Sequence, residues 1–195
     1  STLPITKLAE VLKDRTRFIG IHFFSPVDKM NLVEIIKSEK TSDNSLAVAL
    51  DYTSLIKKTP IVVNDSRGFY ANRCIIPYVN EGLRMISEGI EPALIENSAK
   101  QIGMPVGPLQ LLDELSVSLA LNVAKETKAA LGEEYEESGT ESILLEMSQQ
   151  KRIGRKELAG FYDYDDKGRR QKLWEGLKSL NVEKKNTDIT SESIK

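Results

Sequence analysis

Cysteine, histidine and long apolar runs are scarce in this sequence. Cys74 is the single cysteine, so no intramolecular disulfide can form, and its neighbours Ile75 and Ile76 favour a small buried side chain over a reactive thiol. His22 is the single histidine, which excludes a histidine-rich metal site, and no Cys/His cluster has zinc spacing. No apolar run approaches the roughly 20 residues that span a bilayer. The sequence therefore predicts neither a metal site nor a membrane span.

The sequence also lacks an excess of either basic or acidic residues. The chain has 195 residues, with 27 basic and 29 acidic side chains and a formal net charge of −2. This near-balance gives no reason to expect nucleic acid or an anionic membrane as a partner. A composition of 40% hydrophobic and 29% charged residues is typical of a globular protein, here one ordinary domain or one small domain and part of another.

Two common sequence features are missing. The first residue is Ser1 rather than an initiator methionine, and no signal peptide follows, so we expect the start to be internal to a larger protein. No strand is followed by G-x-G-x-x-G, the glycine-rich turn that binds a dinucleotide. Taken alone, the missing G-x-G-x-x-G turn argues against an oxidoreductase. The argument is weaker if the chain is part of a longer protein.

The first third of the sequence has the pattern of a mixed α/β structure. Its apolar residues predict a short helix, two strands, a helix and a third strand at residues 4–12, 18–24, 32–36, 42–58 and 60–63. Strand, helix and strand in this order indicate part of an α/β unit over residues 1–65.

Beyond residue 66 the periodicity becomes helical. Helices are predicted at residues 69–88, 93–102, 109–112, 117–131 and 141–147. Pro77 is expected to kink or break the first of them. The sequence therefore predicts an all-α domain over residues 66–180, followed by a polar tail or linker over 181–195.

His22 and Glu34 are the two polar residues that the predicted strands do not explain. His22 follows Ile19-Gly20-Ile21 and precedes two phenylalanines, while Glu34 is flanked by four aliphatic residues. Buried polar groups must be paired, and a lone core histidine is the usual explanation of such a pattern. The two strands flank a turn containing Pro26, so the side chains can also face each other. A buried histidine held by a carboxylate is a standard general base.

Two further segments are open to more than one interpretation. Asn72 and Arg73 follow Gly68 at a helix start, where they form either a polar first turn or an amide group that reaches into a cleft. Residues 103–108 are rich in glycine, but two prolines remove amide donors. They therefore favour a structural turn over an anion site.

Several separated motifs together resemble the 3-hydroxyacyl-CoA dehydrogenase family, over about residues 1–180. The amino-acid sequence of residues 25–30 is most similar to that of the dehydrogenase region of multifunctional fatty-acid oxidation enzymes. Examples are the trifunctional-protein alpha subunit and the fatty oxidation complex alpha subunit. The motifs, in the family's order, are Ile19-Gly20-Ile21-His22-Phe23-Phe24-Ser25-Pro26-Val27-Asp28-Lys29-Met30, Leu32-Val33-Glu34-Ile35-Ile36, Gly68-Phe69-Tyr70-Ala71-Asn72-Arg73-Cys74, Met104-Pro105-Val106-Gly107-Pro108 and Gly160-Phe161-Tyr162-Asp163-Tyr164.

The resemblance implies site residues and a cofactor. His22 would be the general base that takes the substrate hydroxyl proton while hydride passes to NAD, and Glu34 would orient its imidazole. Asn72 and Ser1 match the family's active-site asparagine and serine, which hydrogen-bond the reacting oxygen or the imidazole. Ser1 and Ser25 would also contact the cofactor.

The resemblance further implies a fold, a reaction and partners. The expected fold is the C-terminal part of a Rossmann-type α/β domain, followed by an all-α domain like the C-terminal domain of 6-phosphogluconate dehydrogenase. The reaction is oxidation of (S)-3-hydroxyacyl-CoA to 3-ketoacyl-CoA in fatty-acid β-oxidation. The expected partners are the acyl-CoA substrate, a second copy bound through the helical domain and a thiolase subunit. The location would be the cytoplasm in a bacterium, or mitochondria or peroxisomes in a eukaryote.

The sequence departs from the family in four places, one of which is Ser25, where single-function members often have asparagine. The glycine-rich NAD loop of the family's first half is absent, so we expect the isolated chain to be inactive. Ser116-Val117-Ser118 replaces a segment that begins with glycine in the family, and residues 156–160 lack one family glycine. Two alternatives are a catalytically silent helical dimerisation module and a related β-hydroxyacid dehydrogenase with a lysine base. The combination of His22, Glu34, Asn72 and Ser1 argues against the silent module, and the His22–Glu34 arrangement argues against the lysine base.

Overall fold

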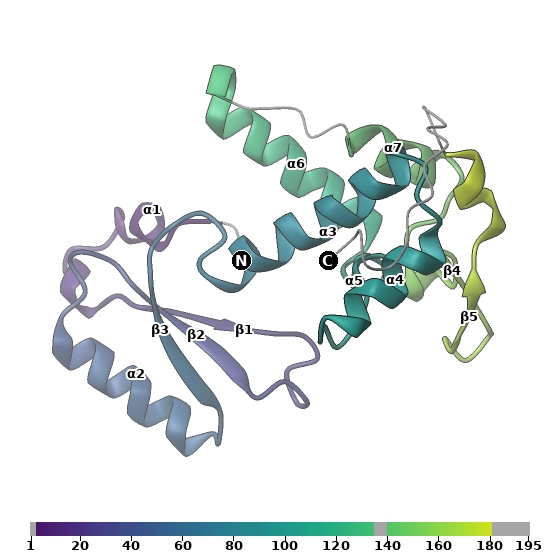
Figure 1. Cartoon of the computed structure of the whole chain (residues 1–195). Helices are drawn as coiled ribbons and strands as arrows, with labels where there is room; N and C mark the ends of the chain where they lie inside the picture. Colours follow the sequence, from purple (N-terminus) through teal and green to yellow (C-terminus); the bar gives the residue numbers. More distant parts are fainter. Residues whose placement is uncertain (1–2, 135–139, 181–195) are drawn as a thin grey trace. The chain divides into compact units, whose positions relative to one another are not determined.

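The computed structural model describes residues 3–134 and 140–180 of the chain (Figure 1). It divides into two compact units, residues 1–76 and 77–195. Ser1 and the predicted tail at 181–195 lie outside the described residues.

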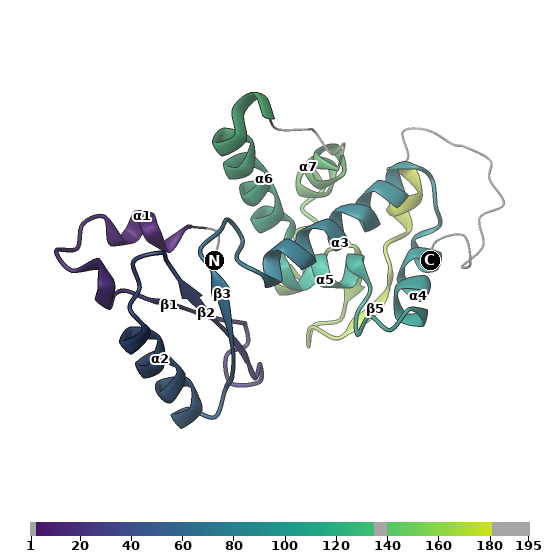
Figure 2. The ribbon, with the colours of Figure 1, turned by 60° about the vertical axis from the view of Figure 1, so that its left-hand side comes forward.

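The first unit is built on a three-stranded sheet in the order β1-β2-β3. Strand β1 (Gly20–Phe23) pairs antiparallel with β2 (Leu32–Lys37), and β2 pairs parallel with β3 (Thr59–Asn64). Helix α2 (Asp43–Leu55) makes the crossover between the two parallel strands and packs along them (Figure 2). These are the strands and the helix that the sequence predicts.

Strand β2 forms the centre of the first unit because its side chains are apolar on both faces. Val33, Ile35 and Ile36 are at most 1% exposed. A strand between two neighbours buries both faces, which explains the continuous aliphatic run around Glu34. The crossover helix begins at Ser42, whose hydroxyl accepts the main-chain N–H of Ser45.

Helix α1 (Ile5–Ala9) is shorter than the predicted helix at residues 4–12. Its first two amides, those of Ile5 and Thr6, donate to the carboxylate of Asp65. Ile5 and Ala9 of the predicted apolar face are buried, whereas Leu8 and Leu12 are exposed. The prediction was wrong at the C-terminal end of this helix, where Leu12 is not buried by any residue that the structure describes.

Helix α3 (Ala71–Ser87) runs through Pro77 without interruption. Pro77 removes the amide that would bond the carbonyl of Arg73. Both residues are exposed, so solvent can hydrate that carbonyl, and the predicted break does not occur. Cys74 is exposed on the same helix, which contradicts the prediction of a buried thiol.

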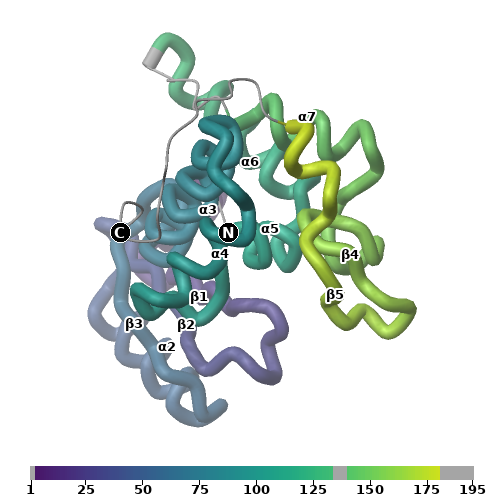
Figure 3. The backbone as a smooth tube through the Cα atoms, turned by 45° about the vertical axis from the view of Figure 1, so that its right-hand side comes forward, coloured from purple at the N-terminus to yellow at the C-terminus, as the bar shows by residue number. Residues whose placement is uncertain are grey.

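Among its described residues, the second unit contains four more helices, a hairpin and short 3-10 turns. Figure 3 shows the path of the chain through these elements. The elements are α4 (Pro92–Gln101), α5 (Pro108–Leu115), α6 (Val117–Leu131), α7 (Glu141–Gln149), β4 (Tyr162–Tyr164) and β5 (Arg170–Leu173). The predicted fold class is confirmed, and the hairpin is an addition that the sequence did not predict. Three of the four residues of β5 are exposed, so it lacks the apolar alternation of a buried strand.

Two buried carboxylates fasten this hairpin to the helices. Asp113 of α5 is 2% exposed and accepts the main-chain N–H groups of Phe161 and Tyr162 and the hydroxyl of Tyr164. Glu96 of α4 is also 2% exposed and accepts the hydroxyl of Tyr162. Gly160 leaves the room for this arrangement, because a Cβ there would lie 2.0 Å from Oδ1 of Asp113.

The stability of the second unit is expected to fall between about pH 4 and pH 6. Burial raises the pKa of Asp113 to about 6, against the lowering effect of its hydrogen bonds from Phe161, Tyr162 and Tyr164. The unfolded chain releases this proton near pH 4, while the folded chain keeps it until about pH 6. The free energy of unfolding should therefore decrease by about 3 kcal/mol across this window.

Urea unfolding of the wild type and of Asp113→Asn across pH 4–7 checks this expectation. The asparagine variant has no carboxyl proton to release, so its stability is the reference. The expectation is contradicted if the free energy of unfolding of the wild type, relative to that of the variant, stays constant or increases as the pH rises.

Candidate active site

The sheet register places His22 of β1 directly opposite Glu34 of β2. The imidazole Nδ1 lies 2.6 Å from Oε2 of the Glu34 carboxylate. Residues at paired positions of antiparallel strands point to the same face, which is why two side chains twelve residues apart meet. The structure thus brings these two predicted site residues together, and their catalytic roles stay a prediction.

Glu34 is fully buried, and both of its oxygens are hydrogen-bonded. Oε2 faces His22, while Oε1 accepts the main-chain N–H groups of Tyr70 at 2.9 Å and Ala71 at 2.8 Å. These donors lie at the start of α3, where amides have no partner within the helix. An ion buried this deeply is tolerated when its lone pairs are satisfied, which is the case here.

The ring of His22 lies near two aromatic side chains. Its centroid is 4.8 Å from that of Phe24 and 5.7 Å from that of Phe69, and its side chain is 16% exposed. In the tautomer with a proton on Nδ1, the imidazole donates to the Glu34 carboxylate and keeps a lone pair on Nε2. Within the part of the chain that the structure describes, no protein group hydrogen-bonds Nε2. This arrangement can act as a general base.

The other predicted site residues have fewer contacts with the His22–Glu34 pair. Asn72 is partly buried in the first turn of α3, immediately after the amide of Ala71 that binds Glu34. Ser25 is exposed, two residues beyond the end of β1, and no hydrogen bond links it to His22 or Glu34. Ser1 lies outside the described residues. The structure therefore brings the backbone next to Asn72 to the His22–Glu34 pair, and it does not bring Ser25 there.

Lys58 is a residue that the sequence reasoning missed. Its ammonium group donates to the carbonyls of Val27 at 2.5 Å and Met30 at 2.7 Å. These bonds hold the loop that follows β1 against the start of β3. The only sign of this role in the sequence is the pair of lysines directly before Thr59. Such a pair is equally typical of an exposed strand end.

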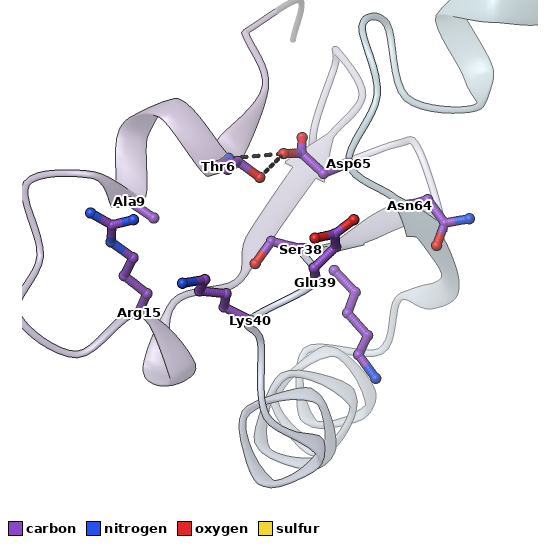
Figure 4. Close-up of a pocket in the computed structure, with 9 residues that line it drawn as sticks. Thr6, Ala9, Arg15, Ser38, Glu39, Lys40, Asn64 and Asp65 are labelled. Carbon is purple, nitrogen blue, oxygen red and sulfur yellow. Dashed lines mark hydrogen bonds between the residues drawn. The ribbon is translucent and has the colours of Figure 1, made fainter.

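A hollow in the first unit lies at the end of β2 and β3, and none of the predicted site residues lines it (Figure 4). Its charged groups are of both signs, and several are already paired: Asp65 with the start of α1, and Lys37 with Asp43 at 3.0 Å. The lining residues are Thr6, Ala9, Arg15, Lys37, Ser38, Glu39, Lys40, Asn64 and Asp65. We do not assign this hollow to the reaction.

In the first unit, side chains bind main-chain amides at the helix starts that the structure describes. Sites for the phosphates of a dinucleotide use the free amides of a glycine-rich turn at a helix start. In the first unit, Glu34 occupies the amides at the start of α3, and Ser42 caps the start of α2. Residues 3–134 and 140–180 also contain no group of three metal-binding side chains and no helix that could cross a membrane.

Two family models match the chain in succession. The model described as 3-hydroxyacyl-CoA dehydrogenase, NAD binding domain, matches residues 1–66. The model described as 3-hydroxyacyl-CoA dehydrogenase, C-terminal domain, matches residues 68–164. Together they account for most of the chain.

Solved structures give the same result. (S)-3-Hydroxybutyryl-CoA dehydrogenase from Ralstonia eutropha is 35% identical with a TM-score of 0.75, over 85% of this chain and 59% of that protein. FadB2 of M. tuberculosis is 28% identical with a TM-score of 0.74, over 84% and 58%. The dehydrogenase part of multifunctional enzyme 1 from C. elegans is 29% identical with a TM-score of 0.65, over 100% and 44%. The chain thus spans less than two thirds of the length of these relatives.

Proposed function

Because the chain belongs to the 3-hydroxyacyl-CoA dehydrogenase family, we propose that it carries the proton-transfer residues of an NAD-dependent (S)-3-hydroxyacyl-CoA dehydrogenase. The reaction is oxidation of 3-hydroxyacyl-CoA to 3-ketoacyl-CoA in fatty-acid β-oxidation. The observation that carries this proposal is the 2.6 Å contact between His22 and the buried Glu34.

His22 acts as the general base of the proposed reaction. Its Nε2 takes the proton of the substrate hydroxyl as the carbon–oxygen double bond forms. A bound NAD would supply the acceptor for the hydride that leaves the same carbon. Glu34 holds the Nδ1 proton and stabilises the positive charge that develops on the imidazole.

The remaining predicted residues assist in orienting substrate and cofactor. Asn72 and Ser1 donate hydrogen bonds to the reacting oxygen or to the imidazole, and Ser1 and Ser25 contact the nicotinamide end of NAD. We also propose a homodimer through the helical unit, and a thiolase subunit as a partner if the protein belongs to a multifunctional complex. The likeness to the dehydrogenase part of the C. elegans multifunctional enzyme supports a multifunctional parent protein, and it says nothing of a thiolase.

The proposal is tested with the full open reading frame that contains this sequence. We expect it to produce NADH from (S)-3-hydroxybutyryl-CoA and NAD, whereas the 195-residue chain alone should produce none, because its sequence has no G-x-G-x-x-G turn. NADH production is followed by absorbance. An inactive full-length protein that still forms dimers would favour the silent dimerisation module. Turnover by the 195-residue chain would show that it holds NAD unaided.

A further inference from the structure

The loop between β1 and β2 buries little of its own surface. Residues 25–30 are all exposed, and the side chains of Val27 and Met30 are 50% and 41% exposed. A loop with so few buried contacts opens readily unless hydrogen bonds restrain it. Lys58 supplies two such bonds, since its ammonium group donates to the carbonyls of Val27 at 2.5 Å and Met30 at 2.7 Å. Bonds from a charged donor are stronger than those from a neutral one.

The end of α2 directs Lys58 toward this loop. Lys57 is left-handed, with φ of 59°, and the amides of both lysines bond to carbonyls in the last turn of α2. These two bonds form a Schellman motif, which ends the helix and reverses the chain. The next residue, Thr59, donates its amide to the carbonyl of Asn31 at 2.8 Å. Two consecutive residues therefore bind three carbonyls of the loop.

The same loop begins beside the His22–Glu34 pair. Phe24 directly follows β1, and its ring centroid is 4.8 Å from that of His22. Ser25 comes next and is exposed. We propose that Lys58 is a positioning residue, which fixes this loop and thereby holds Ser25 in place for the nicotinamide end of NAD. The inference rests on the proposed function, which gives Ser25 this contact.

A restraint of this kind acts on cofactor binding rather than on proton transfer. A loop that is ordered in advance spares the bound cofactor the entropy cost of ordering it. His22 is held by Glu34 and not by the loop carbonyls. Lys58 should therefore lower the Kd for NAD and have little influence on kcat once NAD is saturating.

Lys58→Met in the full-length protein tests the restraint itself. Methionine keeps an apolar stem but has no donor, and the partly exposed position should tolerate it. The amides of Lys29 and Met30 both bond to the carbonyl of Pro26 at 3.0 Å, so their hydrogen exchange reports opening of the loop. Exchange is measured by mass spectrometry without NAD. We expect it to become about tenfold faster, because two charge-assisted hydrogen bonds are lost.

The same variant tests the effect on the cofactor. We expect the Kd for NAD, measured by calorimetry, to rise about 5- to 10-fold, the cost of ordering about one more residue on binding. The kcat at saturating NAD should stay within about threefold of the wild-type value. A general loss of structure would instead lower kcat as well.

Lys57→Met is the matched control. It makes the same substitution and the same change of charge at the neighbouring exposed position, and no hydrogen bond links this side chain to the described residues of the loop. Hydrogen exchange of the loop and the Kd for NAD should both remain those of the wild type.

Three results would overturn the inference: wild-type exchange in Lys58→Met, faster exchange with an unchanged Kd for NAD, or equal effects of Lys57→Met and Lys58→Met. The proposed function fails separately. A full-length wild type that binds NAD but does not oxidise (S)-3-hydroxybutyryl-CoA would contradict that function. The difference in Kd between the two lysine variants would still decide the role of Lys58, because calorimetry requires no turnover.

Discussion

Replacing His22 with glutamine in the full-length protein is expected to lower kcat for (S)-3-hydroxybutyryl-CoA about 10²–10⁴-fold. General acid–base assistance by a positioned side chain contributes a factor of this size, and glutamine cannot take a proton at neutral pH. The imidazole is 16% exposed and lies near Phe24 and Phe69, so no solvent base replaces it readily. The measurement is steady-state NADH formation, with kcat and KM determined separately.

The KM for NAD should change little in this variant, because His22 acts on the substrate hydroxyl. Ser54→Ala is a suitable control. It removes an exposed hydroxyl that bonds only to the Leu50 carbonyl within α2, and kcat should remain that of the wild type. If the His22→Gln protein folds and its kcat stays within a few-fold of the wild-type value, His22 is not the general base. A lysine base, as in related β-hydroxyacid dehydrogenases, would then be the alternative.

The contact between His22 and Glu34 could be predicted because both residues interrupt short apolar strands. Burial demands that such polar groups be paired, and two strands joined by a short turn are adjacent in most sheets. The same reasoning applies to Asp113, which stands among Leu111, Leu112 and Leu115 and is also buried. Its partners could not be foreseen because they belong to a hairpin almost 50 residues later, and that hairpin lacks an apolar pattern.

The anchoring of Glu34 by α3 could not be read from the sequence. It depends on backbone amides, which every residue carries, and on left-handed conformations at Gly68 and Phe69. Glycine suggests the first conformation, but nothing marks phenylalanine for the second. Two departures from the family likewise fall on left-handed residues: Ser116 has φ 82°, and Leu158, in the segment that lacks a glycine, has φ 59°. Their surroundings, rather than their own preferences, set these conformations.

Replacing Asp113 with alanine is expected to reduce the free energy of unfolding of the second unit by about 3–5 kcal/mol. The substitution leaves the amides of Phe161 and Tyr162 and the hydroxyl of Tyr164 without their acceptor in a buried environment. Breaking a buried charged network by removing one member has a cost of this size. Domains are stable by only about 5–15 kcal/mol, so this loss is a large share of the total.

Urea unfolding followed by circular dichroism measures this loss, and Asp166→Ala is the matched control. Asp166 is exposed in the turn of the same hairpin, and its removal should change stability by less than about 0.5 kcal/mol. A loss below about 1 kcal/mol for Asp113→Ala would mean that other contacts fasten the hairpin. Arg152 would be the first to consider, because it donates to the carbonyls of Gly160 and Tyr162. A large loss would instead identify Asp113 as the residue on which docking of the hairpin depends, despite the cost of ionising a carboxyl whose pKa is raised by burial.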